Sequence, residues 1–123
     1  NFFENQTYFR NGYTYNKNTK KIIKAIVVVH TFGNAVNLEK LSILCKNKNI
    51  KIIEDAAESL GTEYIKGKFK GKHTGIIGDL GCISFNSNNI ITAGGGGIIL
   101  TKNKSLSLLK FLEYLFMWLH STK

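Results

Sequence analysis

Cysteine is scarce in this chain: Cys45 and Cys82 are the only two among 123 residues, and they lie far apart in apolar stretches. A disulfide framework needs several paired cysteines in a short chain, so this class of fold is not expected. No C-x-x-C spacing is present either, which argues against a zinc site, and we predict no metal site. Both thiols are therefore expected to be reduced and to lie in the core.

Long hydrophobic runs and arginine are also scarce. No apolar run approaches the roughly 18 residues that a membrane span requires, and no signal peptide is recognisable, so we expect a cytoplasmic protein with no membrane partner. The formal net charge is +9, yet Arg10 is the only arginine among 17 basic residues, and the lysines are scattered. Nucleic-acid recognition favours arginine, whose planar guanidinium binds phosphates and bases in a bidentate manner. A basic nucleic-acid-binding module is thus the least favoured hypothesis, and no nucleic-acid partner is expected.

The composition nevertheless suits a globular domain, because 43% of the residues are hydrophobic and 11% are aromatic. The length allows one domain at most. The chain begins with Asn1 rather than methionine, and residues 106–119 are apolar at most positions. A helix that is apolar on nearly every face is buried inside a larger structure. We therefore interpret the chain as a part of a longer protein, with residues 103–123 forming an apolar C-terminal helix.

Hydrophobic patterns predict a β-α-β unit in the middle of the chain. Residues 22–29 form a run of mostly β-branched apolar residues, as expected for a buried parallel strand. Residues 38–45 carry apolar side chains at helical spacing; Asn37 can cap this helix, and Asn49 can end it in the left-handed conformation. Residues 50–54 form the next apolar strand, so the two strands are predicted to be parallel with a right-handed crossover.

The remaining segments are predicted from turn residues and short apolar runs. Residues 1–21 are polar and aromatic and are expected to form a surface loop or hairpin. Residues 62–72 alternate and contain two glycines, which indicates an exposed hairpin. Residues 81–85 and 98–101 are expected to be strands, separated by a polar loop and a glycine-rich turn. The predicted fold class is therefore α/β with a mostly parallel sheet and flanking helices. Four side chains are expected in its core: Val27, Val28, Ile52 and Ile53.

Polar residues gather where the predicted strands end, which is where ligands of open parallel sheets bind. Glu54 and Asp55 end one strand. Burying a carboxylate at the end of an apolar strand costs free energy unless the charge is paired. Asp55 either caps a following helix or presents a fixed negative charge to a cationic group of a ligand. Ser84 and Asn86 bring a hydroxyl and an amide to the end of another strand, where they could hold a phosphate. The glycines at 94–97 match neither a Walker loop nor the G-x-G-x-x-G fingerprint, so both of those phosphate sites are rejected.

Three segments together resemble the DegT/DnrJ/EryC1/StrS family of sugar aminotransferases. They are AIVVVHTFGN (25–34), IEDAAESLG (53–61) and GDLGCISF (78–85), and the resemblance extends over residues 22–102. Members of this family are pyridoxal-phosphate (PLP) enzymes of the aspartate-aminotransferase fold type, and they aminate nucleotide-linked keto sugars for surface polysaccharides. The resemblance implies that residues 22–102 are a partial PLP-binding large domain. It also implies a nucleotide-linked keto sugar and an amino donor such as glutamate as partners, and a homodimer.

The resemblance assigns a role to each matching position of the cofactor site. Asp55 falls where the family places the carboxylate that pairs with the pyridine nitrogen, which keeps the ring an electron sink. Ala57 falls where a small side chain packs against the ring face, and Glu58 falls where a polar residue stands near the ring hydroxyl. Ser84 falls where a hydroxyl binds the cofactor phosphate.

One catalytic position departs from the family pattern. The lysine that binds the cofactor covalently as a Schiff base comes shortly after the phosphate-binding serine, and Asn89 occupies its place. A carboxamide is not nucleophilic and has no usable acid–base pKa, so it replaces neither the covalent link nor the proton shuttle. The favoured hypothesis is a fragment of a sugar aminotransferase. The alternative is an inactive remnant that binds only the cofactor or a partner subunit, and Asn89 favours this alternative for the chain itself.

Overall fold

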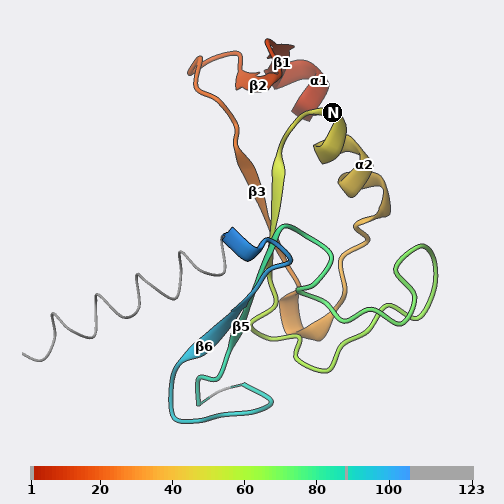
Figure 1. Ribbon diagram of the computed structural model, residues 1–123, viewed down its shortest axis with the longest axis vertical. Coiled ribbons are helices and arrows are strands. Elements are labelled where there is room, and N and C mark those ends of the chain that lie inside the picture. The colour runs from red at the N-terminus through yellow and green to blue at the C-terminus, as the bar shows by residue number, and fades with distance from the viewer. Residues whose placement is uncertain (1, 88, 106–123) are drawn as a thin grey trace, which may run out of the picture.

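The computed structural model describes residues 2–87 and 89–105 (Figure 1). In chain order the elements are α1 (Phe2–Gln6), β1 (Thr7–Arg10), β2 (Tyr13–Asn16), β3 (Ala25–Val29), the 3-10 turn η1 (Thr31–Gly33), α2 (Glu39–Asn47), β4 (Lys51–Asp55), β5 (Leu80–Ser84) and β6 (Gly97–Leu100). No helix within these described ranges is long and apolar enough to cross a membrane. The helix predicted over 103–123 lies, from position 106 onward, outside the described residues.

Four strands form the main sheet in the order β3-β4-β5-β6. β3, β4 and β5 run parallel, and β6 returns antiparallel to β5. The predicted α/β class with a mostly parallel sheet is therefore confirmed. The strands β1 and β2 form a separate antiparallel hairpin near α2 (Figure 1). There the hydroxyl of Thr14 donates a hydrogen bond to the Lys48 carbonyl at 2.6 Å, which joins the hairpin to the end of the helix.

The helix α2 connects β3 to β4, as the β-α-β pattern predicted. Leu38 is its N-cap residue, so the predicted cap, Asn37, stands one position too early. The side chain of Asn37 nevertheless accepts the N–H of Glu39 at 3.1 Å, which satisfies one of the amides that a helix leaves unpaired at its start. At the other end Asn49 has a φ of 51°, the left-handed conformation predicted for it. The end of the helix is thus confirmed, and its start is shifted by one residue.

The side chains of the sheet alternate between two faces, and α2 covers one of them, which we call the inner face. The buried core on this side consists of Val28, Leu38, Cys45, Ile50, Ile52 and Phe69. The predicted core positions of Val28 and Ile52 are confirmed. Val27 is 60% exposed and Ile53 is only partly buried, so their predicted place in the core is wrong. Because successive residues of a strand point to opposite sides, both lie on the face that the described residues leave without a second layer.

The segment 62–72 folds back on itself and is mostly exposed, as the predicted hairpin requires, but it contains no regular strands. In place of two strands it has one isolated bridge, between Glu63 and His73. Phe69 is only 8% exposed, and its ring packs edge-on against that of Tyr64, with ring centroids 5.9 Å apart. Phe69 and Tyr64, whose hydroxyl donates a hydrogen bond to the Val36 carbonyl at 2.9 Å, therefore hold this loop against the core, and the alternating pattern did not reveal these contacts.

A buried carboxylate joins β3, β4 and the loop before β5. Glu54 is fully buried on the inner face, and its Oε2 lies 2.9 Å from Nε2 of the equally buried His30. His30 Nδ1 accepts the N–H of Val36 at 3.1 Å, so the proton of the ring is on Nε2 and is donated to Glu54. The carboxylate of β4 is thereby tied to the residue that follows β3.

Three backbone amides complete the surroundings of Glu54. Gly75 donates its N–H to Oε2 at 2.9 Å, and Ile77 and Gly78 donate theirs to Oε1 at 2.7 and 2.6 Å. Burial raises the pKa of Glu54, but the hydrogen bonds from His30 and from the three amides outweigh it and hold the pKa below its ordinary value. With this many N–H donors, the carboxylate stays ionised inside the protein.

The same loop packs against β5 with no room for a side chain. A Cβ placed on Gly81 would lie 1.8 Å from the carbonyl oxygen of Gly75, well inside the contact distance of real atoms. Gly81 faces the inner side, beside Glu54 in the strand register. Glycine at this position therefore lets the loop reach Glu54 with its amides.

We expect Gly81→Ala to lower the free energy of unfolding by more than about 2 kcal/mol, because the loop has to move away from β5. Gly95→Ala is the matched control: a Cβ there meets nothing within 4 Å, so a change within about 0.5 kcal/mol is expected. Urea unfolding followed by circular dichroism measures both. Equal stability of the two variants would contradict the close packing of β5 and the loop.

We expect Glu54→Gln to lower the free energy of unfolding at pH 7 by about 3 kcal/mol, since the amide nitrogen of glutamine would face buried N–H donors. The exposed Glu63 supplies a control, and Glu63→Gln is expected to change stability by less than about 0.5 kcal/mol. Urea unfolding at pH 7 compares the two variants with the unaltered chain.

The lowered pKa of Glu54 adds a pH dependence to this comparison. Its stabilisation is fully present above the unfolded-state pKa of about 4.3 and is lost as the pH falls through the lower folded-state pKa. The stability difference between the unaltered chain and Glu54→Gln should therefore be constant from pH 7 to about 5 and shrink below about 4. A difference that persists unchanged into strong acid would show that the charge of Glu54 is not what stabilises the fold.

Candidate functional site

Two of the predicted site residues end neighbouring parallel strands. Asp55 is the last residue of β4, and Ser84 is the last residue of β5. Asp55 is paired with Cys82 in the register, and Ser84 lies two residues further along the same strand, so all three belong to the same face. This is the face opposite to α2, which we call the open face. The structure therefore brings Asp55 and Ser84 to one edge and one face of the sheet.

The carboxylate of Asp55 is held by its own turn. Its Oδ1 accepts the N–H of Ala57 at 3.1 Å, and its backbone carbonyl accepts the N–H of His30 at 2.9 Å. A turn follows β4 at this point rather than a helix, so Asp55 is not the helix cap that the sequence left open as an alternative. The half-buried carboxylate stands at the end of the strand, and the other alternative, a contact with a cationic group of a ligand, stays a prediction.

A second carboxylate links the turns that follow β3 and β4. Glu58 is exposed, and its Oε2 accepts the N–H of Phe32 at 2.9 Å. Phe32 has a φ of 51°, which bulky residues seldom adopt, and its side chain is 84% exposed. Glu58 thus already serves to hold the turn at this edge. Phe32 was not among the predicted site residues, because nothing in its sequence neighbourhood marks a left-handed conformation.

The loop between β5 and β6 carries the serine and the position of the missing lysine. Ser84 Oγ accepts the N–H of Asn86 at 3.2 Å, and Asn89 donates its N–H to the carbonyl of Asn86 at 3.0 Å. Ala93 closes the loop by donating its N–H to the Phe85 carbonyl at 3.1 Å. Asn89 therefore lies in a turn just beyond Ser84, past the carboxyl end of β5.

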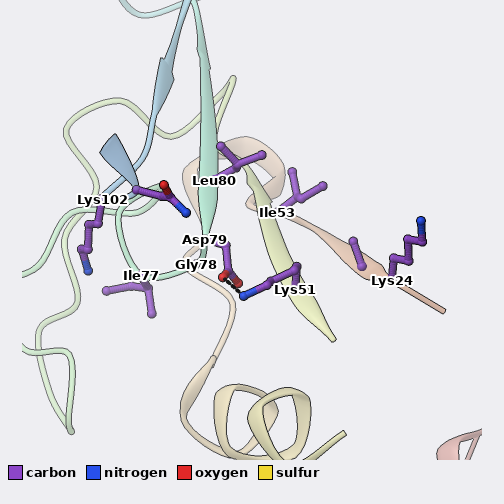
Figure 2. Close-up of a pocket in the computed structure, with 10 residues that line it drawn as sticks. Lys24, Lys51, Ile53, Ile77, Gly78, Asp79, Leu80 and Lys102 are labelled. Carbon is purple, nitrogen blue, oxygen red and sulfur yellow. Dashed lines mark ion pairs between the residues drawn. The ribbon is translucent and has the colours of Figure 1, made fainter. Parts of the chain in front are cut away.

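Four hollows in the described part of the chain lie away from Asp55, Ser84 and Asn89. One of about 780 Å³ is at the opposite end of β3 and β4, where Lys51 Nζ pairs with Asp79 Oδ1 at 3.0 Å (Figure 2). Three lysines from separate segments border it: Lys24, Lys51 and Lys102. Neither Asp55 nor Ser84 lines this hollow or three smaller ones in the described part of the chain, so their convergence on one cavity stays a prediction.

Nothing in the described chain offers a metal site. Its histidines, cysteines, aspartates and glutamates form no group of three or more that could hold a metal ion. Cys45 is buried, and its burial, together with the smaller effect of the negative charge of Asp79, raises the pKa of its thiol. The imidazole of His73 is engaged locally, because its Nε2 accepts the N–H of Gly61 at 2.6 Å. The groups available at the carboxyl edge are therefore carboxylates, a hydroxyl and amides.

Known proteins resemble this chain in sequence. A family model, the DegT/DnrJ/EryC1/StrS aminotransferase family, matches residues 13–111. A GDP-perosamine synthase of Escherichia coli O157:H7 is 41% identical over 83 residues, which cover 68% of this chain and 21% of that protein. The chain thus spans about a fifth of the length of this curated relative.

Solved structures resemble the chain in fold as well. Helicobacter pylori PseC, an aminotransferase involved in the biosynthesis of pseudoaminic acid, matches with a TM-score of 0.61 and 31% identity over 68% of this chain and 21% of its own. An Escherichia coli GDP-4-keto-6-deoxy-D-mannose-3-dehydratase with bound hydrated PLP matches with a TM-score of 0.56 and 30% identity over 66% and 20%. The family match includes the whole four-stranded sheet and every predicted site residue, and the chain belongs to the DegT/DnrJ/EryC1/StrS aminotransferase family.

Proposed function

We propose that this chain is a part of a PLP-dependent aminotransferase acting on a nucleotide-linked keto sugar. The observation that carries the proposal is the placement of Asp55 and Ser84 on one face, at the carboxyl ends of neighbouring parallel strands. The pyridine nitrogen and the phosphate are distant parts of one rigid molecule, so they require a carboxylate and a hydroxyl on the same side of the sheet. Ligands of parallel sheets bind at this edge.

The residues present fit the non-covalent contacts of PLP. Asp55, fixed by the N–H of Ala57, would pair with the pyridine nitrogen and favour its protonated form. When bound, PLP supplies the electron sink of amino transfer. Ala57 would leave room for the ring face, and Glu58 would stand near the ring hydroxyl. Ser84 Oγ would donate a hydrogen bond to the phosphate while still accepting the N–H of Asn86.

Asn89 does not fit the covalent contact. Its carboxamide forms no covalent bond with the cofactor and transfers no proton at neutral pH. The chain as it stands would therefore bind PLP reversibly and not turn over an amino donor. This observation supports a second candidate function, an inactive remnant that binds the cofactor or a partner subunit.

The partners of the longer protein are proposed from the family. The relatives named above include a GDP-perosamine synthase and an aminotransferase involved in pseudoaminic acid biosynthesis. From these relatives and the family we propose that the longer protein acts on a nucleotide-linked keto sugar and uses an amino donor such as glutamate. We also propose that it is a homodimer and helps to make surface polysaccharide sugars. The described residues supply only the strand ends of such a site.

The cofactor contacts can be tested by equilibrium binding. We expect PLP to quench the fluorescence of the unaltered chain with saturation. Asp55→Asn and Ser84→Ala should each weaken binding at least about tenfold, which corresponds to about 1.4 kcal/mol. Ser87→Ala removes an exposed hydroxyl of the same loop and should leave the affinity unchanged. Equal affinities for all four proteins would place the bound PLP elsewhere.

The identity of position 89 can be tested by covalent trapping. Borohydride treatment of the unaltered chain with PLP should leave no adduct at Asn89, since its amide cannot form the bond that borohydride reduces. Asn89→Lys should give an adduct at that position, located by peptide mass spectrometry. Asn86→Lys, in the same exposed loop, is the control and should react no faster than the surface lysines. Equal labelling of both introduced lysines would show that position 89 is not directed at a cofactor.

A further inference from the structure

Phe32, in the turn after β3, is a large apolar side chain that lies mostly in solvent. It is 84% exposed, compared with 60% for Val27 on the open face. Its backbone has a φ of 51° and a ψ of 34°, in the left-handed region that a bulky residue adopts only at a cost in free energy. A ring this exposed contributes little to packing, so packing within the described residues does not explain the strain.

Hydrogen bonds on both sides of Phe32 hold this turn in place. Glu58 Oε2 accepts the Phe32 N–H at 2.9 Å, and the Thr62 hydroxyl donates to the Gly33 carbonyl at 3.0 Å. Gly33 also donates its N–H to the carbonyl of the buried His30 at 3.2 Å. The phenyl ring is therefore presented from a fixed turn, and contacts with the segment that follows β4 maintain the strained backbone.

This turn stands next to the carboxylate assigned to the pyridine nitrogen. The N–H of His30, two residues before Phe32, donates to the Asp55 carbonyl at 2.9 Å. Glu58, which accepts the Phe32 N–H, is also the residue proposed to stand near the ring hydroxyl of PLP. In PLP, the ring carbon next to the hydroxyl-bearing carbon carries the group that reacts with the substrate. With PLP placed as proposed above, Phe32 lies on the side of the cofactor where the substrate arrives.

A sugar ring is recognised by two kinds of surface. Its hydroxyl groups stand at the rim and need polar partners, whereas its faces carry C–H groups and pack against flat apolar groups. Ligand pockets generally combine aromatic or apolar walls with a few placed polar groups. The residues assigned to the site above supply carboxylates, a hydroxyl and a methyl group. The phenyl ring of Phe32 adds a flat apolar surface to them.

We propose that Phe32 determines specificity for the sugar ring of the substrate, by packing its phenyl ring against a C–H face of that sugar. Glu58 acts as a positioning residue here, because its bond to the Phe32 N–H holds the strained turn. The assignment rests on the proposed function, since it takes the position of PLP from Asp55 and Ser84. It adds to that function a residue that contacts the substrate rather than the cofactor.

Two stable ligands separate the contact with the cofactor from the contact with the sugar. Pyridoxamine phosphate contains the cofactor alone, and its N-cyclohexyl derivative adds a saturated six-membered ring in place of the sugar. Equilibrium dialysis with the unaltered full chain should show the derivative binding at least about fivefold more tightly, as one packed ring contributes. Phe32→Asn should abolish this preference. Because asparagine tolerates the left-handed conformation, this variant should not lower the urea midpoint of unfolding.

Three further variants serve as controls for the dialysis experiment. Phe32→Tyr keeps the aromatic ring and should keep the preference for the cyclohexyl derivative. Phe9→Ala removes a 47% exposed phenyl ring from the hairpin of β1 and β2, and it should leave the preference unchanged. Asp55→Asn should weaken both ligands by the same factor, because both contain the same pyridine ring.

The outcomes distinguish this proposal from the proposed function. A preference that survives Phe32→Asn, while Asp55→Asn still weakens both ligands, would overturn the role of Phe32 and leave the cofactor site intact. Equal affinity of the unaltered chain for the two ligands would do the same, and so would a loss of the preference in Phe9→Ala. If Asp55→Asn weakens neither ligand, the proposed function is wrong, and the role of Phe32 is wrong with it.

Discussion

The carboxylate of Glu54 is the contact on which the arrangement of the strands depends. It accepts hydrogen bonds from His30, which follows β3, and from the amides of Gly75, Ile77 and Gly78, which precede β5. An ionised carboxylate without partners would be very costly to bury, so the fold is stable only when these donors are in place. Three segments that are separate in sequence are thereby held at fixed positions around β4.

The buried contact of Glu54 also determines where the candidate site lies, because successive side chains of a strand point to opposite faces. Glu54 points to the inner face, so its neighbour Asp55 must point to the open face. The carbonyl of Asp55 accepts the N–H of His30, and the N–H of Ala56 donates to the Cys82 carbonyl, both at 2.9 Å. The same pairing of strands that buries the structural carboxylate therefore presents the second one at the sheet edge, beside the end of β5. One carboxylate stabilises the fold, and the next stands half-buried at the sheet edge.

The elements near the chain's apolar runs could be predicted from sequence, because β-branched runs and helical spacing report local structure. Val28 and Ile52 were placed correctly for this reason, and Asn49 was placed correctly because asparagine tolerates the left-handed conformation that ends a helix. The exposure of Val27 could not be predicted, since periodicity identifies two faces but not whether a second layer exists to cover one of them. Likewise, the anchor Phe69 lies in an alternating segment that looks like an exposed hairpin.

The placement of Asp55 and Ser84 at one edge of the sheet was predicted from the rule that ligand-binding residues gather at strand ends, while their contacts with a cofactor stay a prediction. Glu54 and Asp55 were both recognised there, and the resemblance assigned Asp55 to the pyridine nitrogen, but the structural role of Glu54 was not predicted. The alternation of side chains along the strands contained the missing information: Glu54 shares the buried face with Ile52 on its own strand and with Val28 on the neighbouring strand. The left-handed turn at Phe32 and its contact with Glu58 have no sequence pattern of their own, because they depend on two turns that meet only in the folded chain.

We infer that Asp55 and Ser84 together hold one PLP molecule on the open face. A crystal structure of the chain grown with PLP would show whether they do. We expect the pyridine nitrogen within hydrogen-bond distance of the Asp55 carboxylate and the phosphate at Ser84 Oγ, with no covalent bond at Asn89. A cofactor bound instead in the lysine-bordered hollow at the other end of the strands would contradict it.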